Sequence, residues 1–127
     1  MSIAKPRIAI VGLDLVGRSL GLALRQAEVA SVVVGHDRDR QLSAEAKARG
    51  AVDRTEWNLI AAVEKTDIVV LSEPIDALAA TMQAIGPYLR PGCVVMDTAP
   101  TADTLRLLAF PDIANWYFDH LFHMFRN

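Results

Sequence analysis

The sequence predicts an α/β domain with a three-layer, doubly wound parallel sheet and helices on both of its faces. Three observations support this fold class. Short apolar runs alternate with longer helical stretches about five times along the 127 residues. The connections between them are short, as expected for parallel strands joined by crossover helices. The first apolar run leads into a glycine-rich turn, and no linker or low-complexity tract divides the chain.

The elements can be placed in order from their apolar patterns. We expect strands at 8–11, 31–35, 67–71 and 93–96, a short one at 51–53, and a further one at 116–118. We expect helices from the glycine turn to about 27, then at 41–49, 58–65, 76–89 and 100–110. Asp76 is the predicted N-cap of its helix, and Gly50 the predicted C-terminal cap. The inward face of the first helix should carry Leu15, Val16, Leu20, Ala23 and Leu24.

The composition excludes several classes of protein. The net charge is −2, and no cluster of Lys and Arg is present, so a nucleic-acid-binding face is not expected. The single cysteine, Cys93, cannot form an internal disulfide and is expected in the core. We find no signal peptide and no apolar run that could span a membrane, which predicts a cytoplasmic protein. Residues 1–127 are expected to form one domain with an atypical apolar, aromatic-rich tail at about 112–127.

The glycine-rich turn predicts a nucleotide site. It follows a buried strand and opens a helix, which is the setting in which a dinucleotide pyrophosphate binds at a helix N-terminus. A turn of this kind alone is a weak signal, since its glycines can serve chain reversal and packing only. The candidate cofactor-binding residues here are Gly12, Leu13, Asp14, Leu15, Val16 and Gly17.

Asp14 stands where the G-x-G-x-x-G pattern has its middle glycine. Its side chain should obstruct the approach of the pyrophosphate, and its charge should repel it. At about 4–5 Å and an effective dielectric constant of about 20, two like charges repel by roughly 3–4 kcal/mol. Arg18 could neutralise part of this charge, or it could be a solvated residue of the helix face.

Asp37 follows the second predicted strand, about 20 residues beyond Gly17. An acid at this distance accepts hydrogen bonds from the adenosine ribose hydroxyls. A carboxylate would repel a 2′-phosphate, which favours NAD over NADP. Arg38 and Arg40 keep NADP open, because arginine is the usual phosphate partner. The alternative is an exposed loop whose charges largely cancel.

Further polar residues follow the later strands. Ligands of open parallel sheets bind at the carboxyl ends of strands, so we expect Ser72, Glu73, Pro74 and Thr98 to border the ribose or nicotinamide. Loop and capping roles are an equal alternative for them. His120 and His123 have no third ligand nearby, so no metal site is expected. No nucleophile–base pair stands out, and the catalytic residues are unknown.

Together, IAIVGLDLVGRSLGLAL, VVVGHDRD, TDIVVLSEPIDAL and LRPGCVVMDTAP resemble the N-terminal domain of prephenate dehydrogenase, also called arogenate dehydrogenase. Ser19-Leu20 and the segment 74–76 are typical of that family. The resemblance implies a Rossmann fold and an NAD-dependent oxidative decarboxylation in tyrosine biosynthesis. It implies that Gly12 and Gly17 hold the pyrophosphate, that Asp37 holds the ribose, and that 72–74 and Thr98 border the cofactor.

The chain departs from the family pattern after the fifth predicted strand. The D-x-G-S-x-K segment corresponds to DTAPTA at 97–102, without the serine and lysine, and the G-G-H-P segment is not matched. The family's helical substrate domain is absent from these residues. We therefore expect an NAD(P)-binding domain that is inactive alone. The alternative is a non-catalytic module, either a nucleotide-responsive regulator or an interaction domain. The tail at 112–127 should either pack on the edge of the sheet or contact a helical domain or a second copy of the chain, and no nucleic-acid or membrane partner is expected.

Overall fold

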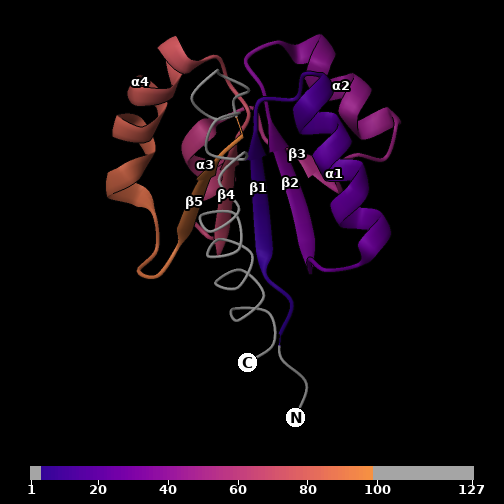
Figure 1. Cartoon of the computed structure of the whole chain (residues 1–127), viewed down its shortest axis with the longest axis horizontal. Coiled ribbons are helices and arrows are strands. Elements are labelled where there is room, and N and C mark those ends of the chain that lie inside the picture. The colour runs from indigo at the N-terminus through magenta and orange to yellow at the C-terminus, as the bar shows by residue number, and fades with distance from the viewer. Residues whose placement is uncertain (1–3, 99–127) are drawn as a thin grey trace, which may run out of the picture.

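The computed structural model describes residues 4–98, which contain a central sheet flanked by helices (Figure 1). The elements are β1 (Arg7–Val11), α1 (Leu15–Ala27), β2 (Val32–His36), α2 (Arg40–Ala48), β3 (Arg54–Thr55), α3 (Leu59–Val63), β4 (Ile68–Leu71), α4 (Ile75–Ile85), the 3₁₀ turn η1 (Gly86–Tyr88) and β5 (Val94–Asp97). The predicted elements at 100–110 and 116–118 and the tail at 112–127 lie outside the described residues.

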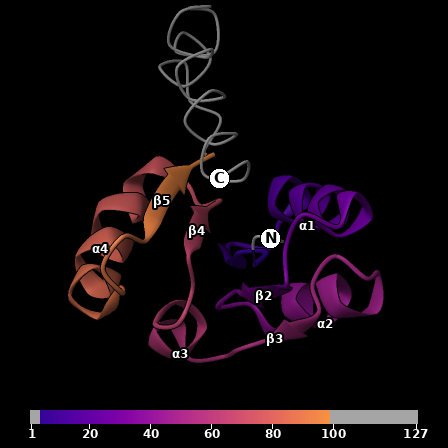
Figure 2. The ribbon, with the colours of Figure 1, turned by 90° about the horizontal axis from the view of Figure 1, so that it is seen from below.

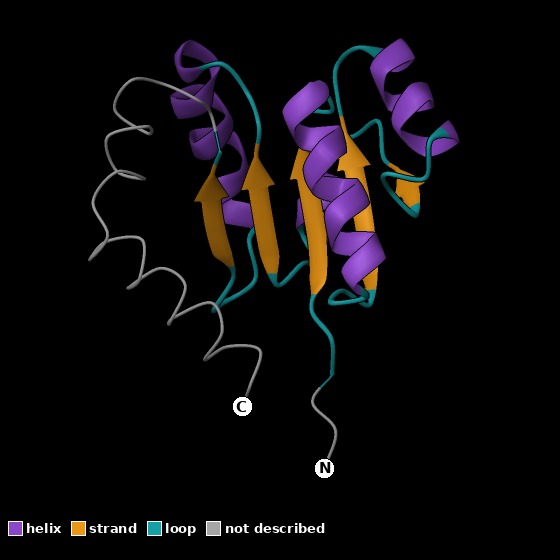
Figure 3. Cartoon of the chain, turned by 45° about the vertical axis from the view of Figure 1, so that its right-hand side comes forward, coloured by secondary structure: helices purple, strands orange, loops and turns teal. Residues whose placement is uncertain are grey.

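The strands form one parallel sheet in the order β3-β2-β1-β4-β5. The chain builds outward from β1 to β3, then returns to the other side of β1 for β4 and β5. The order therefore reverses between β1 and β4, which is the position where open α/β sheets bind ligands, beyond the carboxyl ends of the strands. Those ends lie at the top of Figure 3. The predicted doubly wound sheet is confirmed.

Alternate residues of each strand bury against opposite helical layers. Ile8 and Ile10 of β1 pack in one apolar cluster with residues of α1 and α2. Ala9 and Val11 pack in the other with residues of α3 and α4. Figure 2 shows the two helical pairs on the two sides of the curved sheet. Burial on both faces explains why β1 and β4 are continuous apolar runs in the sequence.

The third strand was predicted at 51–53, and this is wrong: it lies at Arg54–Thr55. The reason is the way α2 ends. The backbone N–H of Ala51 donates to the carbonyl of Ala46, so Ala51 completes the helix end instead of pairing with β2. Ala51 and Val52 are nonetheless fully buried, which explains their apolar character.

The predicted inward face of α1 is wrong at its first turn and at Ala23. Leu15 is 71% exposed, Val16 is 38% exposed and Ala23 is also exposed, whereas Leu20 and Leu24 pack against the core. The helix begins beyond the carboxyl end of β1, so its first turn lies past the part of the sheet that could cover it. Leu15 and Val16 are therefore exposed at the N-terminal end of α1.

The predicted N-cap of α4 is also wrong. Pro74 occupies the capping position, and Asp76 lies inside the first turn. A carboxylate in the first turn still interacts favourably with the positive end of the helix dipole. The helix predicted to end at 89 ends at Ile85, because the chain continues as the 3₁₀ turn η1 from Gly86.

Candidate functional site

The turn after β1 depends on two glycines. Gly12 has a φ of +100°, and a Cβ on it would lie 2.1 Å from the carbonyl oxygen of Ser72. A Cβ on Gly17 would lie 1.9 Å from the carbonyl oxygen of Gly12. The turn is therefore packed backbone to backbone against the loop after β4 and against the start of α1. These contacts explain both glycines without a ligand, while they also bring the helix N-terminus to the switch point.

Asp14 is the N-cap of α1. Its Oδ1 accepts a hydrogen bond from the backbone N–H of Gly17 at 3.2 Å and another from the hydroxyl of Ser72 at 3.2 Å. The extended backbone of Asp14, with φ −71° and ψ −169°, is typical of a helix N-cap. A side chain of this chain thus occupies the helix end at which a phosphate is usually bound.

Asp37 links the turn after β2 to the turn after β1. One carboxylate oxygen accepts from the backbone N–H of Leu13 at 2.7 Å, and the other accepts from that of Asp39 at 2.8 Å. The side chain of Leu13 is fully buried, so this residue anchors the contact to the core. Each oxygen keeps acceptor capacity, since a carboxylate offers about four acceptor sites. Asp37 is therefore held in place and can still accept from a hydroxyl.

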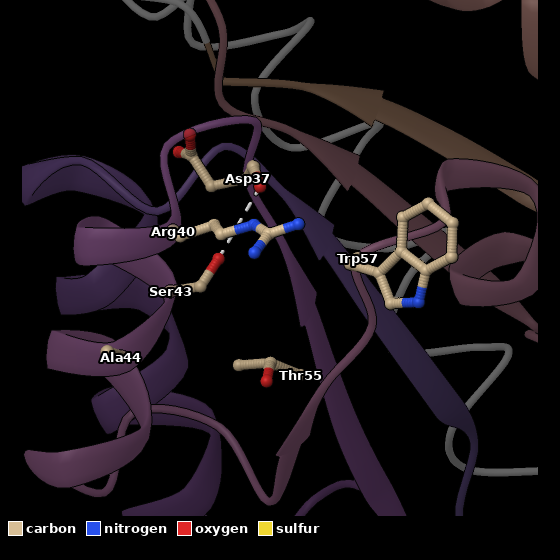
Figure 4. A pocket seen from close by; sticks show the side chains of 6 residues that line it. All are labelled: Asp37, Arg40, Ser43, Ala44, Thr55 and Trp57. Atoms are coloured by element: carbon tan, nitrogen blue, oxygen red, sulfur yellow. Dashed lines mark hydrogen bonds between the residues drawn. The ribbon is translucent and has the colours of Figure 1, made fainter.

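A cavity of about 420 Å³ lies beside Asp37. α2 supplies one wall, and Thr55 of β3 and Trp57 after it supply the other (Figure 4). Trp57 is 79% exposed, so its indole face is open to a ligand. The hydroxyl of Ser43 donates to the backbone carbonyl of Asp37 at 3.5 Å and ties α2 to this turn. The residues that line the cavity are Asp37, Arg40, Ser43, Ala44, Thr55 and Trp57.

Of the candidate residues after β4 and β5, the side chains of Glu73 and Thr98 bond within their own part of the fold, whereas that of Ser72 bonds to the glycine turn. The Glu73 carboxylate accepts from the hydroxyl of Thr81 in α4 at 2.6 Å. Pro74 begins α4, and the hydroxyl of Thr98 donates to the carbonyl of Leu71 at 3.2 Å. Ser72 is 5% exposed, and its hydroxyl reaches Asp14. Within the described part of the chain, Ser72 is the one of these four residues whose side chain forms a hydrogen bond to the glycine turn.

The charged residues near the turns have definite partners. Arg18 pairs with Glu45 of α2, with 2.6 Å between the guanidinium and the carboxylate. Arg18 therefore binds a different carboxylate from Asp14. Arg38 and Arg40 are both exposed, and of the two Arg40 lines the cavity. His36 is buried, and its Nδ1 donates to the carbonyl of Glu56 at 2.8 Å, a structural role.

Of the six residues that line the cavity, the sequence singled out Asp37 and Arg40, and the other four were missed. Ser43 and Ala44 share a helix face with Arg40, since positions three and four apart are neighbours. That spacing could have indicated them. Trp57 is an isolated aromatic residue in a polar stretch, and this too could have indicated a binding residue. Nothing in the sequence indicated Thr55, because the strand that contains it was predicted at 51–53.

The fold and the site define a nucleotide-binding α/β domain of the dehydrogenase type. The sequence profile of the family described as "Prephenate dehydrogenase, nucleotide-binding domain" matches residues 20–105. The chain belongs to this family. The matched range begins beyond the glycine turn, so it does not include Asp14.

Individual relatives agree with the family. A prephenate dehydrogenase of Lactococcus lactis subsp. cremoris (strain MG1363) is 28% identical over 104 residues, which cover 81% of this chain and 29% of that protein. The structure of Synechocystis arogenate dehydrogenase has 30% identity and a TM-score of 0.67, over 73% of this chain and 32% of the other. That of A. aeolicus prephenate dehydrogenase, in complex with hydroxyphenyl propionate and NAD+, has 25% identity and a TM-score of 0.70, over 78% and 35%. The chain thus spans about a third of the length of these relatives.

Residues 4–98 contain neither a membrane-spanning helix nor a candidate metal cluster. No helix in this part of the chain is long and apolar enough to cross a membrane. Within the same residues, no group of three or more His, Cys, Asp or Glu side chains could hold a metal ion. The histidines at 120 and 123 lie outside the described residues.

Proposed function

We propose that this chain is the NAD-binding domain of a prephenate dehydrogenase-like oxidoreductase and holds the adenosine half of the cofactor at Asp37. The observation that carries this proposal is the position of Asp37. Its carboxylate is held by the N–H groups of Leu13 and Asp39, at the rim of a cavity that can take an adenine ring. The A. aeolicus relative binds NAD+, which supports the same ligand here.

The remaining residues are assigned by their place around this anchor. Asp37 would accept from the ribose hydroxyls, and Trp57 would offer its face to the adenine ring. The residues of the glycine turn, 12–17, would lie against the pyrophosphate, and 72–74 and Thr98 against the ribose and nicotinamide. The bound cofactor would supply hydride transfer. These residues would bind and orient it.

NAD is favoured over NADP, because the Asp37 carboxylate would repel a 2′-phosphate. Arg40 is the observation that supports the second possibility, since its guanidinium lies in the wall of the same cavity (Figure 4). Asp37→Asn should narrow the preference for NAD over NADP, because the amide has nearly the same shape as the carboxylate but carries no negative charge to repel a 2′-phosphate. Asp39→Asn is the matched control, since the Asp39 side chain instead caps Gln41 at the start of α2.

Titration of the chain with NAD and NADP by calorimetry tests the proposal. We expect NAD to bind more tightly, and to raise the unfolding free energy by about 2.7 kcal/mol at a concentration 100 times its dissociation constant. If neither ligand binds at millimolar concentration, the proposal is wrong.

By resemblance, oxidation of prephenate needs a helical substrate domain, so we expect no NAD reduction when prephenate is added to this chain alone. We expect residues 112–127 to contact such a domain or a second copy. The alternative function, a non-catalytic regulator or interaction module, is favoured by one observation: Asp14 already occupies the N-terminus of α1.

A further inference from the structure

Asp14 joins the two loops that meet at the switch point. Its Oδ1 accepts from Gly17 at the start of α1 and from the Ser72 hydroxyl of the loop after β4. The loops also touch beneath it, because Gly12 packs directly on the Ser72 carbonyl. Ser72 is anchored in turn, since its backbone N–H donates to the carbonyl of Val11 at 2.7 Å. The carboxylate therefore lies over the junction of β1 and β4.

The carboxylate uses donors that a bound phosphate would use. The first N–H groups of a helix have no partner within the helix and carry its positive dipole end. In α1 one of them, that of Gly17, already donates to Asp14. A phosphate placed here would compete for this donor and would meet a negative charge at close range.

No side-chain cation within residues 4–98 forms an ion pair with Asp14. The four ion pairs in that range join Arg18 to Glu45, Arg25 to Asp53, Arg54 to Glu56 and Arg90 to Asp67. Arg18 lies nearest to Asp14 along the sequence, but its guanidinium is 2.6 Å from Glu45 on α2. Within residues 4–98, the hydrogen-bond donors to the Asp14 carboxylate are thus the N–H of Gly17 and the hydroxyl of Ser72.

We infer that Asp14 is a specificity-determining residue that selects adenine ligands by the charge at their 5′ end. The inference rests on the proposed function, since it assumes that adenosine binds at Asp37. Adenosine places no charge against Asp14, whereas AMP and ADP add phosphates toward the start of α1. Each added phosphate should therefore fail to improve binding in the natural chain, unlike in a site with glycine at this position.

The test compares adenosine, AMP and ADP by calorimetry in the natural chain and in Asp14→Asn, at low salt and with EDTA. Asn is as good an N-cap as Asp and can accept from Gly17 and Ser72, so the fold should be kept. We expect ADP to bind Asp14→Asn about tenfold more tightly than the natural chain, a difference of about 1.4 kcal/mol. Adenosine should bind both within about twofold, because it carries no charge to be repelled.

Asp39→Asn is the matched control, since Asp39 is the N-cap of the neighbouring helix α2 and the change removes the same charge. It should leave the ratio of ADP to adenosine affinity unchanged. The inference is overturned if Asp39→Asn tightens ADP as much as Asp14→Asn does, or if Asp14→Asn changes adenosine and ADP equally. If NAD binds but adenosine binds neither protein, the inference alone is overturned; if neither NAD nor NADP binds at millimolar concentration, the proposed function is wrong and the inference falls with it.

Discussion

Asp14 in the turn after β1 and Asp37 in the turn after β2 are two carboxylates with different surroundings. Both accept a backbone N–H: Asp37 from Leu13 and Asp39, and Asp14 from Gly17. Asp37 stands at the rim of a cavity and can accept from a ligand hydroxyl. Asp14 stands at the start of a helix, where the expected ligand group is an anion. If the proposed function holds, the same chemical group would favour a ligand at one turn and oppose part of it at the other.

The largest expected effect is that of a methyl group in the turn after β1. Gly12→Ala should destabilise the chain by at least about 3 kcal/mol, because overpacking and an unfavourable positive φ act together. The new Cβ would lie 2.1 Å from the Ser72 carbonyl oxygen, and φ is +100°. Denaturant unfolding followed by circular dichroism measures the loss.

Gly86→Ala is the control for that substitution. Gly86 has helical backbone angles, and, its own helical stretch aside, no atom of residues 4–98 lies within 4 Å of its Cβ position. We expect this variant to be as stable as the natural chain or slightly more stable, by up to about 1 kcal/mol. If Gly12→Ala unfolded no more easily than Gly86→Ala, the close contact between the β1 and β4 loops would be refuted.

The second effect compares the two carboxylates as supports of the fold. Asp37→Ala should destabilise by about 2 kcal/mol, because it leaves the N–H of Leu13 without its charged acceptor. Asp14→Ala should destabilise by about 1 kcal/mol, the usual value for loss of an N-cap. Thermal unfolding of both variants checks the order. A larger loss for Asp14→Ala would mean that Asp14 holds the switch point together more strongly than Asp37 does.

The smallest effect concerns the opposite edge of the described sheet, where Cys93 precedes β5. Burial is the main cause that raises the pKa of the Cys93 thiol. Its alkylation by iodoacetamide should therefore reach half of its maximal rate at a higher pH than that of an unfolded peptide thiol. The raised pKa favours the protonated thiol in the folded state, so its contribution to stability is present below the unfolded pKa and is lost as pH rises through the folded one.

The same labelling experiment, applied to Asp14→Asn and Asp39→Asn, tests whether a change in the turns after β1 and β2 reaches the surroundings of Cys93. Neither Asp14→Asn nor Asp39→Asn changes a residue in the surroundings of Cys93, so its labelling profile should stay the same in both. A profile that moved with Asp14→Asn alone would show that the turn after β1 influences the sheet as far as β5.

The fold was largely predictable because the strands are buried on both faces and appear as unbroken apolar runs. The ends of the helices were less predictable than the strands, because tertiary contacts decide where a helix stops. The N–H of Ala51 bonds to the end of α2 instead of joining β3, and Pro74, not Asp76, is the N-cap of α4. Asp37 was predictable from its distance to Gly17. The bond from Asp14 to Ser72 was not, because it joins residues 58 positions apart. Trp57 was missed because its place beside α2 depends on where β3 pairs with β2.

α1 is held against the rest of the chain at two successive turns by main-chain contact. Gly17 meets the Gly12 carbonyl, and a Cβ on Gly21 would lie 2.3 Å from the carbonyl oxygen of Ala51. At these two glycines the nearest atom is a backbone carbonyl oxygen, so a change of side-chain rotamer could not relieve the contact. The position of α1 is consequently fixed by main-chain contact. Main-chain atoms of α1 should superpose between free and ligand-bound forms, and the torsions of the Asp14 side chain at its N-terminus are where a phosphate would be accommodated.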